Sequence, residues 1–258
     1  MSVTLPVLSA HLDTLLRVQA VPDYPNAVNG VQFGHRGPVR AVATAVDASA
    51  ATISEAARSG ANLLLVHHGL FWGGVGPIVG FRHDRIRLLV EHDVAVYSAH
   101  LPLDTHEEFG NSRLLAARLS LGVTGAFAHF QGVACGVCGE ADLATASLLR
   151  AVDEFATANG GRAVASAFEP DRHTRRWGIC SGAGAGTATI AEAVSLGLDT
   201  LVVGEGPHWT AVDAPEQGLV IIYAGHYATE TLGVQALGGY LSTMYSIPHC
   251  FAAAPTGL

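Results

Sequence analysis

The chain alternates short, almost continuously apolar runs with longer stretches whose apolar residues recur at helical spacing. Alternation of this kind predicts an α/β protein with parallel or mixed sheets that helices cover on both faces. Asn111 or Ser112 is expected to cap the third helix. The expected strands are residues 39–47, 61–66, 94–99, 130–140, 176–182, 198–204 and 218–225, and the expected helices are residues 50–60, 82–93, 111–122, 187–197 and 231–245.

Two segments of the pattern align with each other without a gap. Residues 51–72 and 188–209 are identical at ten of 22 positions, at an offset of 137 residues. The helix, the following glycine, the strand and a terminal tryptophan (Trp72 and Trp209) all stay in register. Ala-rich helices can match by chance, but chance does not readily align the strand, glycine and tryptophan as well. We interpret the two segments as products of an internal duplication.

The resemblance continues beyond these segments, with a shorter connection. Residues 96–104 resemble residues 222–230, so that His100 matches His226 and Asp104 matches Glu230. Each unit thus ends a strand and then presents a histidine and, four residues later, a carboxylate. Ligands of open α/β sheets bind at the carboxyl ends of strands. The pattern therefore predicts a functional site there.

Histidines and carboxylates dominate the residues at these strand ends. The first unit has His67 and His68 where the second has Gly204 and Glu205. A set without cysteine suits zinc, manganese, iron or cobalt. Neighbouring residues of an extended chain point to opposite sides, so the paired histidines could serve two ions, or one could be a core residue. The candidate set is His67, His68, His100, Asp104, Glu205, His208, His226 and Glu230.

The remaining motifs and residue groups carry weaker signals. The other eight histidines are read as structural or solvated. Cys135 and Cys138 lie in a strand-like stretch, which favours ordinary buried thiols over a redox or metal-binding pair. Residues 181–187, "SGAGAGT", fit either an anion-binding loop or a tight strand–helix turn, because the lysine of a P-loop is missing. No serine-nucleophile elbow is present.

Composition excludes two classes of partner. The formal net charge is −8 and no Lys/Arg cluster appears, so no nucleic-acid partner is expected. No apolar run approaches the roughly 20 residues of a membrane helix. The first residues lack a basic region and carry Asp13, which argues against a signal peptide. These features of the 258-residue chain predict a cytoplasmic protein that binds no membrane.

Five segments, in this order along nearly the whole chain, match a known family. The chain resembles the Nif-three-like dinuclear metal-centre proteins, which are also described as GTP cyclohydrolase I type 2 homologues. The paired histidines and the final "GHYATE" are specific in combination. The matching segments are "NGVQFG" (29–34), "ANLLLVHHGLFWG" (61–73), "AHLPLDTHEEFGNSRLLA" (99–116), "GEGPHW" (204–209) and "YAGHYATETLGVQAL" (223–237).

The resemblance implies a fold and an assembly. It implies two similar, intertwined three-layer α/β/α domains, without the inserted domain of some relatives. We place these domains at residues 1–125 and 126–258 and expect the C-terminal helix to pack back on the first. The family typically forms toroidal hexamers, so a homo-hexamer is expected.

The resemblance also implies a site with two divalent ions. Its ligands, carried over by motif, are His67, His68, Asp104, His226 and Glu230. It suggests a metal-dependent hydrolase acting on a nucleotide-like or other small molecule, as a GTP cyclohydrolase would. The alternative is a non-catalytic, ring-shaped protein that binds or handles metal.

Three further residues are candidates for catalysis or orientation of the ligands. His100, Glu205 and His208 could transfer protons or hold the ligands in place. Pro102 disfavours helical geometry at the preceding residue, so we expect an extended connection that leaves His100 outside the ligand set. The segment 226–230 has no proline. A helix beginning near Ala228 would therefore hold Glu230 in its first turn.

Overall fold

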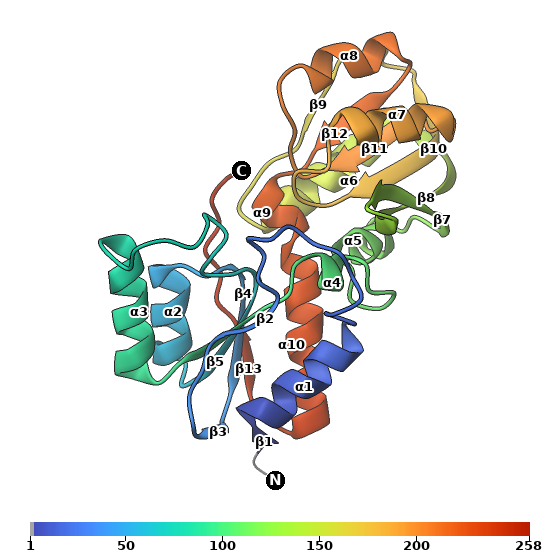
Figure 1. Cartoon of the computed structure of the whole chain (residues 1–258). Helices are drawn as coiled ribbons and strands as arrows, with labels where there is room; N and C mark the ends of the chain where they lie inside the picture. The colour runs from blue at the N-terminus through green and yellow to red at the C-terminus, as the bar shows by residue number, and fades with distance from the viewer. Residues whose placement is uncertain (1–2) are drawn as a thin grey trace. The chain divides into compact units, whose positions relative to one another are not determined.

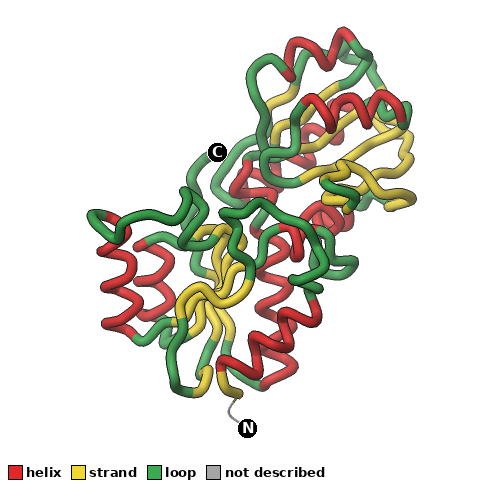
Figure 2. Tube along the Cα trace, viewed as in Figure 1, coloured by secondary structure: helices red, strands yellow, loops and turns green. Residues whose placement is uncertain are grey.

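The computed structural model describes residues 3–258, which form two units. Unit 1 is the chain up to His106 together with Gly233–Ala254, and unit 2 is Glu107–Leu232 with Pro255–Leu258. In each unit a sheet has helices on both faces, as Figures 1 and 2 show. The sequence-based division at residue 125 differs from this one. Leu115, Ala116 and Leu121 pack with the core of unit 2, so residues 107–125 belong there.

Unit 1 is built on a mixed sheet with the strand order β13-β4-β5-β6-β2. Strands β4, β5, β6 and β13 run parallel, and β2 pairs antiparallel with β6 at one edge. The short strands β1 and β3 pair separately. The strands are β1 (Val3–Thr4), β2 (Gly30–Phe33), β3 (Pro38–Val39), β4 (Val42–Asp47), β5 (Leu63–His68), β6 (Ala95–Ser98) and β13 (His249–Phe251).

Alternate residues of these strands pack into two apolar layers, one on each face of the sheet. Leu64 and Val66 of β5 pack with α2 and α3, whereas Leu63 and Leu65 point to the opposite face. Helices α1 and α10 cover that second face (Figure 1). The helices are α1 (Leu5–Leu15), α2 (Ala50–Arg58), α3 (Phe81–His92), α4 (Leu101–Asp104) and α10 (Thr231–Tyr245), of which α10 begins in unit 2.

Unit 2 is built on a sheet with the order β7-β8-β10-β11-β12-β9, parallel at its centre. Helices α5 and α6 pack on one face, and α7 and α8 pack on the other. The strands are β7 (Val123–Phe130), β8 (Val133–Ala144), β9 (Val164–Ala165), β10 (His173–Cys180), β11 (Thr200–Val203) and β12 (Val220–Tyr223). The helices are α5 (Asn111–Arg118), α6 (Thr145–Ala158), α7 (Thr187–Ser195), α8 (Thr210–Glu216) and α9 (His226–Thr229).

The aligned segments of the two units have the same secondary structure. Helices α2 and α7 begin and end at aligned residues, and β5 and β11 begin at aligned residues. Trp72 and Trp209 both lie in the turn beyond the strand. The sequence prediction of helix, strand and turn is therefore confirmed in both segments. Their origin by duplication stays our interpretation.

Helix starts differ in one detail from the sequence prediction. Ser49 caps α2 through a reciprocal pair of hydrogen bonds with Thr52, which fixes where that helix begins. In α5 the N-cap is Gly110, without a side-chain cap, rather than Asn111 or Ser112. Ser112 is buried and donates instead to the carbonyl of Cys135 at 3.0 Å, so its hydroxyl is committed to tertiary structure.

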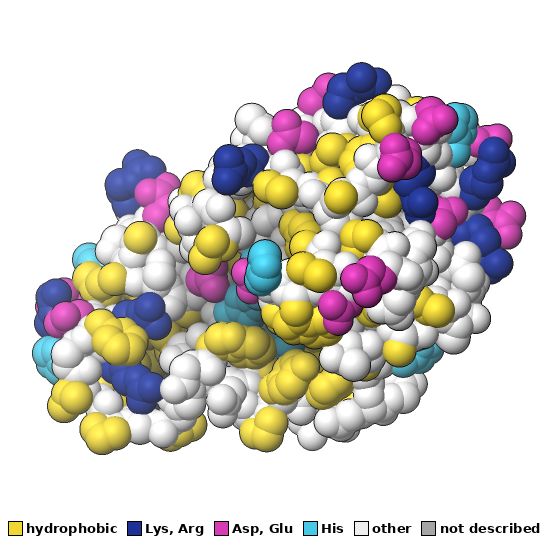
Figure 3. Space-filling model, turned by 90° about the horizontal axis from the view of Figure 1, so that it is seen from above, with side chains coloured by type: hydrophobic (Ala, Val, Ile, Leu, Met, Phe, Trp, Pro, Cys, Tyr) yellow, Lys and Arg dark blue, Asp and Glu magenta, His cyan; other side chains and the backbone are white. Residues whose placement is uncertain are grey.

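None of the helices within residues 3–258 has the length and apolar character needed to cross a membrane. On the face drawn in Figure 3, basic and acidic side chains are interspersed rather than separated by sign.

A substitution at Gly139 would test the packing of unit 2. A methyl group there would collide with the carbonyl oxygen of Gly122 and approach Cζ2 of Trp177 to 2.6 Å. Gly139→Ala should therefore reduce the free energy of unfolding by about 1–3 kcal/mol, measured by urea denaturation. Gly122→Ala is the matched control, because nothing lies within 4 Å of its added Cβ. Equal stability of the two variants would contradict this packing.

Candidate metal centre

The paired histidines close a strand that is buried on both faces. His67 and His68 are the last residues of β5, and all six residues of that strand are buried. The alternation of an extended chain predicts opposite directions for neighbouring side chains. The two rings nevertheless lie together, with centroids 4.8 Å apart. The end of β5 thus presents two imidazoles at one place.

Each histidine at the strand ends of unit 1 is held through Nδ1. His67 Nδ1 donates to the carbonyl oxygen of Ala99 at 2.9 Å, because a carbonyl can only accept. His68 Nδ1 lies 3.0 Å from Oδ1 of Asp47, and His100 Nδ1 lies 2.8 Å from Oδ1 of Asp23. Ionised carboxylates also only accept, so the proton of each neutral ring sits on Nδ1. The other nitrogen, Nε2, then carries the lone pair that can bind a metal ion.

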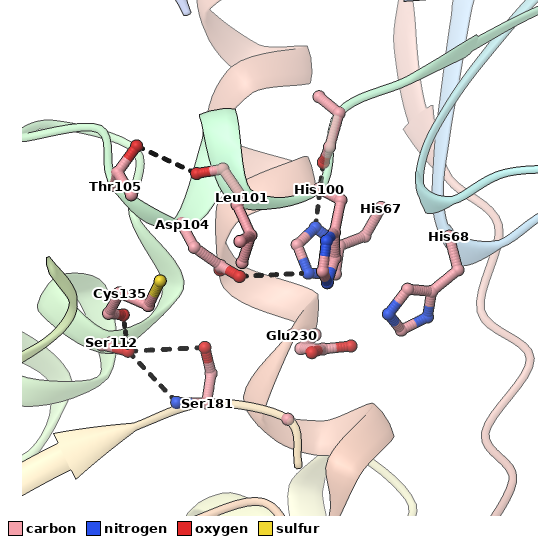
Figure 4. A network of polar contacts seen from close by, with 12 residues as sticks. His67, His68, His100, Leu101, Asp104, Thr105, Ser112, Cys135, Ser181 and Glu230 are labelled. Carbon is pink, nitrogen blue, oxygen red and sulfur yellow. Dashed lines mark hydrogen bonds and ion pairs between the residues drawn. The ribbon is translucent and has the colours of Figure 1, made fainter. Parts of the chain in front are cut away.

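The three imidazoles of unit 1 form one group. One nitrogen from each of His67, His68 and His100 lies within 4.8 Å of the others, and all three residues are buried. Asp104 adds a carboxylate, with Oδ2 3.4 Å from Nε2 of His67 (Figure 4). Three nitrogens and an oxygen in a small buried volume are a donor set that divalent transition metals accept.

The connection between His100 and Asp104 is not extended, so that prediction was wrong. Leu101–Asp104 form the short helix α4, and the amide of Asp104 donates to the carbonyl of His100 at 3.1 Å. Pro102 fits because the first turn of a helix needs no amide hydrogen from that residue. The helical turn keeps both ends of the segment at the site. His100 is therefore in the same histidine group as His67 and His68.

Asp23 organises the loop around His100. Its carboxylate accepts hydrogen bonds from the His100 ring, the Asn29 side chain, and the amides of Tyr24 and Leu101. Burial opposes ionisation of this carboxyl group. The hydrogen bond from His100, with those from Asn29 and Tyr24, outweighs burial and lowers the pKa of Asp23 below its usual value. An ionised Asp23 in turn fixes the orientation of His100.

Unit 2 repeats this arrangement with a different set of partners. His226 Nδ1 lies 2.9 Å from Oε1 of Glu205, and His226 Nε2 lies 3.2 Å from Oε2 of Glu230. Burial disfavours a charged His226. Glu230 and Glu205 outweigh burial through hydrogen bonds and charge, and they raise the pKa of His226 to about 9. The helix expected to begin near Ala228 is two helices, α9 from His226 and α10 from Thr231, and Glu230 lies between them rather than in a first turn.

Two glycines shape the unit 2 group. A side chain at Gly182, whose φ is +61°, would collide with Oε1 of Glu230. A side chain at Gly204 would approach the hydroxyl of Thr229 to 2.7 Å. Gly204 aligns with His67 of unit 1, so unit 2 has no room for a histidine at that position. The "SGAGAGT" segment thus makes space for Glu230 and His226.

The remaining candidates lie apart from these groups. His208 is exposed in the turn before α8, and the groups within residues 3–258 that could hold a metal ion do not include it. Cys135 and Cys138 lie on strand β8, as predicted, and Cys135 is buried. Neither belongs to those groups.

Asp23 and Asp47 were not identified from the sequence. Both hold a histidine ring from a distant part of the chain, and neither belongs to a motif. Asp47 is the last residue of β4, which pairs with β5. Its position at a strand end was the only feature of the sequence that could have indicated a role in the site. Asp23 lies in a loop and carried no such signal.

The geometry defines an α/β protein with histidine–carboxylate groups that can bind metal. A family model described as Duf34/NIF3 (NGG1p interacting factor 3) matches residues 3–255. The chain therefore belongs to the Duf34/NIF3 family, as the sequence motifs predicted.

Curated relatives of the chain share one name. A protein of Deinococcus radiodurans named GTP cyclohydrolase 1 type 2 homolog is 41% identical over 254 residues, covering 96% of this chain and 92% of that protein. A protein of Escherichia coli with the same name is 34% identical and covers 96% and 97% of the two chains.

Solved structures resemble the chain over its full length. The structural-genomics protein ybgI, of unknown function, has a TM-score of 0.87 and 31% identity, with 100% of both chains covered. A protein from Thermus thermophilus has a TM-score of 0.83 and 36% identity, covering 97% of this chain and 98% of that chain.

Gly182 provides a test of the unit 2 group. Gly182→Ala should weaken metal binding about tenfold or more, because the methyl group displaces the carboxylate of Glu230. Gly186→Ala, in the same segment, is the control, since nothing lies within 4 Å of its Cβ and its φ of −162° is extended. Metal titration of both variants measures the effect. Unchanged affinity in Gly182→Ala would rule out this role.

A substitution at Asp47 would test whether its carboxylate orients His68 for metal binding. Asp47→Ala should lower metal affinity roughly 10–100-fold, the usual cost of losing a partner that orients a ligand. Asp142→Ala is the matched control, because Asp142 accepts the same Nδ1 hydrogen bond from the exposed His173. Competition with a coloured chelator gives both affinities. Equal losses in the two variants would show that the effect is not specific to the candidate site.

Proposed function

We propose that the chain binds two divalent metal ions through His67, His68, Asp104, His226 and Glu230. The observation that carries the proposal is the common arrangement of the histidines, each of which has Nδ1 held by an oxygen acceptor. This arrangement leaves Nε2 as the nitrogen that would bind an ion, and His226, whose pKa is raised to about 9, would release its second proton on binding. The five donors exceed one tetrahedral set, which favours two ions over one. Nitrogen and oxygen donors without sulfur suit zinc, manganese, iron or cobalt.

We further propose that the protein is a metal-dependent hydrolase acting on a nucleotide-like or other small substrate. Two divalent ions supply Lewis acidity and activate water at neutral pH. His100 is the candidate for proton transfer, because Asp23 holds its Nδ1 and directs Nε2 to the histidine group. Glu205 orients His226. His208 is a further candidate, exposed and therefore accessible to a substrate.

The name shared by the relatives supports hydrolysis of a guanine nucleotide as the first activity to test. A second candidate function is a ring-shaped, non-catalytic metal-binding protein. An exposed apolar run, Val75, Ile78, Val79 and Phe81, favours self-association, because such side chains are costly to leave in water. We propose a homo-hexamer on this ground and on the family resemblance. Metal-loaded protein that hydrolyses none of the tested nucleotides or phosphoesters would favour this second function.

Metal stoichiometry is the central test. Elemental analysis of protein purified without added metal, then reconstituted, should give about two divalent ions per chain. His226→Ala should lose at least one ion. His100→Ala should retain both, because His67, His68 and Asp104 supply three donors without it, and water can complete the coordination. Hydrolysis should fall in both variants.

Two outcomes would contradict the proposal. A content of one ion or none after reconstitution would exclude the dinuclear centre. Equal metal loss in His226→Ala and His100→Ala would make His100 a ligand, in keeping with its place in the histidine group of unit 1. A hydrolysis screen over nucleotides and phosphoesters then separates the two candidate functions.

A further inference from the structure

Two exposed aromatic side chains of unit 1 meet at a right angle beside the histidine group. Trp72 is 36% exposed and Tyr24 is 50% exposed. Their ring centroids lie 6.4 Å apart, and the ring planes are inclined by 79°. Large aromatic side chains normally bury most of their surface, so two partly exposed rings in contact require an explanation.

Neighbouring side chains hold this aromatic corner in place. The Trp72 ring centroid lies 4.5 Å from that of His100 and 4.7 Å from that of His68. The backbone amide of Tyr24 donates to Asp23, the same carboxylate that holds His100. The corner is therefore fixed to the residues proposed for metal binding and proton transfer.

A cationic side chain contacts the residue that follows Trp72. The Arg82 guanidinium donates to the carbonyl of Gly73 at 3.2 Å. A Cβ at Gly76 would come within 2.7 Å of Nη1, so Arg82 lies across the turn that follows Trp72. A guanidinium presents a planar set of donors that matches phosphate or carboxylate.

We propose that Trp72 and Tyr24 bind a flat heteroaromatic ring and that Arg82 binds an anionic group attached to that ring. A ring that stacks on one aromatic face meets the other at its edge, which is the geometry aromatic pairs prefer. Nucleobases stack on aromatic side chains in the same way. The substrate class is then a nucleotide or a similar phosphorylated heterocycle. This inference rests on the proposed function, because the ring is held beside the metal-binding histidines.

Three probes separate the two parts of the proposed subsite. Guanosine 5′-monophosphate carries ring and phosphate, guanosine carries only the ring with its sugar, and ribose 5-phosphate carries no aromatic ring. Calorimetric titration of zinc-loaded protein gives each Kd. Trp72→Leu should raise the Kd of both ring-bearing probes about tenfold or more and leave ribose 5-phosphate unchanged. Trp72→Phe should retain most of the affinity.

The chain offers matched controls for both substitutions. Trp209 aligns with Trp72 in the other unit and is 39% exposed, so Trp209→Leu should leave all three Kd values unchanged. Arg82→Gln should weaken guanosine 5′-monophosphate but not guanosine. Arg87→Gln removes a charge from the same helix, where Arg87 pairs with Glu91, and should affect neither probe.

Metal content, measured on every sample, separates this inference from the proposed function. Zinc-loaded protein that binds no ring-bearing probe, or that binds ribose 5-phosphate equally well, would overturn the aromatic subsite while leaving the metal centre intact. An equal effect of Trp209→Leu would overturn it as well. Failure of wild-type protein to retain zinc, manganese, iron or cobalt would instead overturn the proposed function.

Discussion

The hydrogen bond at Nδ1 of each histidine is the constraint on which the site depends. A neutral imidazole has one proton, and fixing it on Nδ1 decides which nitrogen can act as a base or a ligand. The acceptors come from different elements: Asp47 ends β4, Ala99 follows β6, and Glu205 follows β11. The parallel register places them correctly, since the amide of Ala99 donates to Val66 one residue before His67. The sheet thus sets the chemistry by aligning strand ends.

The two units meet this constraint with different residues. Unit 1 has room for an imidazole at His67, whereas unit 2 has Gly204 there because Thr229 occupies the space. A carboxylate holds a ring in both cases, but Asp23 comes from a loop and Glu205 from the strand end itself. Equivalent backbone positions therefore carry different parts of the site. This explains why the motifs of the two units look different although their helices and strands align.

Much of the fold could be predicted from the sequence because its strands are buried on both faces. The apolar run before His67 leaves little choice of structure, and α10 has the bounds that its spacing predicts. Long-range partners could not be predicted, because Asp23 meets His100 only after folding. Pro102 was misread because proline is readily accommodated in the first turn of a helix, where its missing amide hydrogen has no helical partner to lose. The boundary near residue 107 depends on packing of α5, which periodicity does not reveal.

The divided course of unit 1 has a consequence for biosynthesis. Strand β13 pairs with β4, and the two are separated in sequence by the whole of unit 2. A nascent chain that has left the ribosome up to His106 lacks both β13 and the whole of α10. The edge of β4 and one apolar face of the sheet therefore stay exposed until the last residues emerge. Unit 2 can complete its core earlier, since nearly all of it is contiguous. Vectorial synthesis thus favours maturation of the second unit before the first.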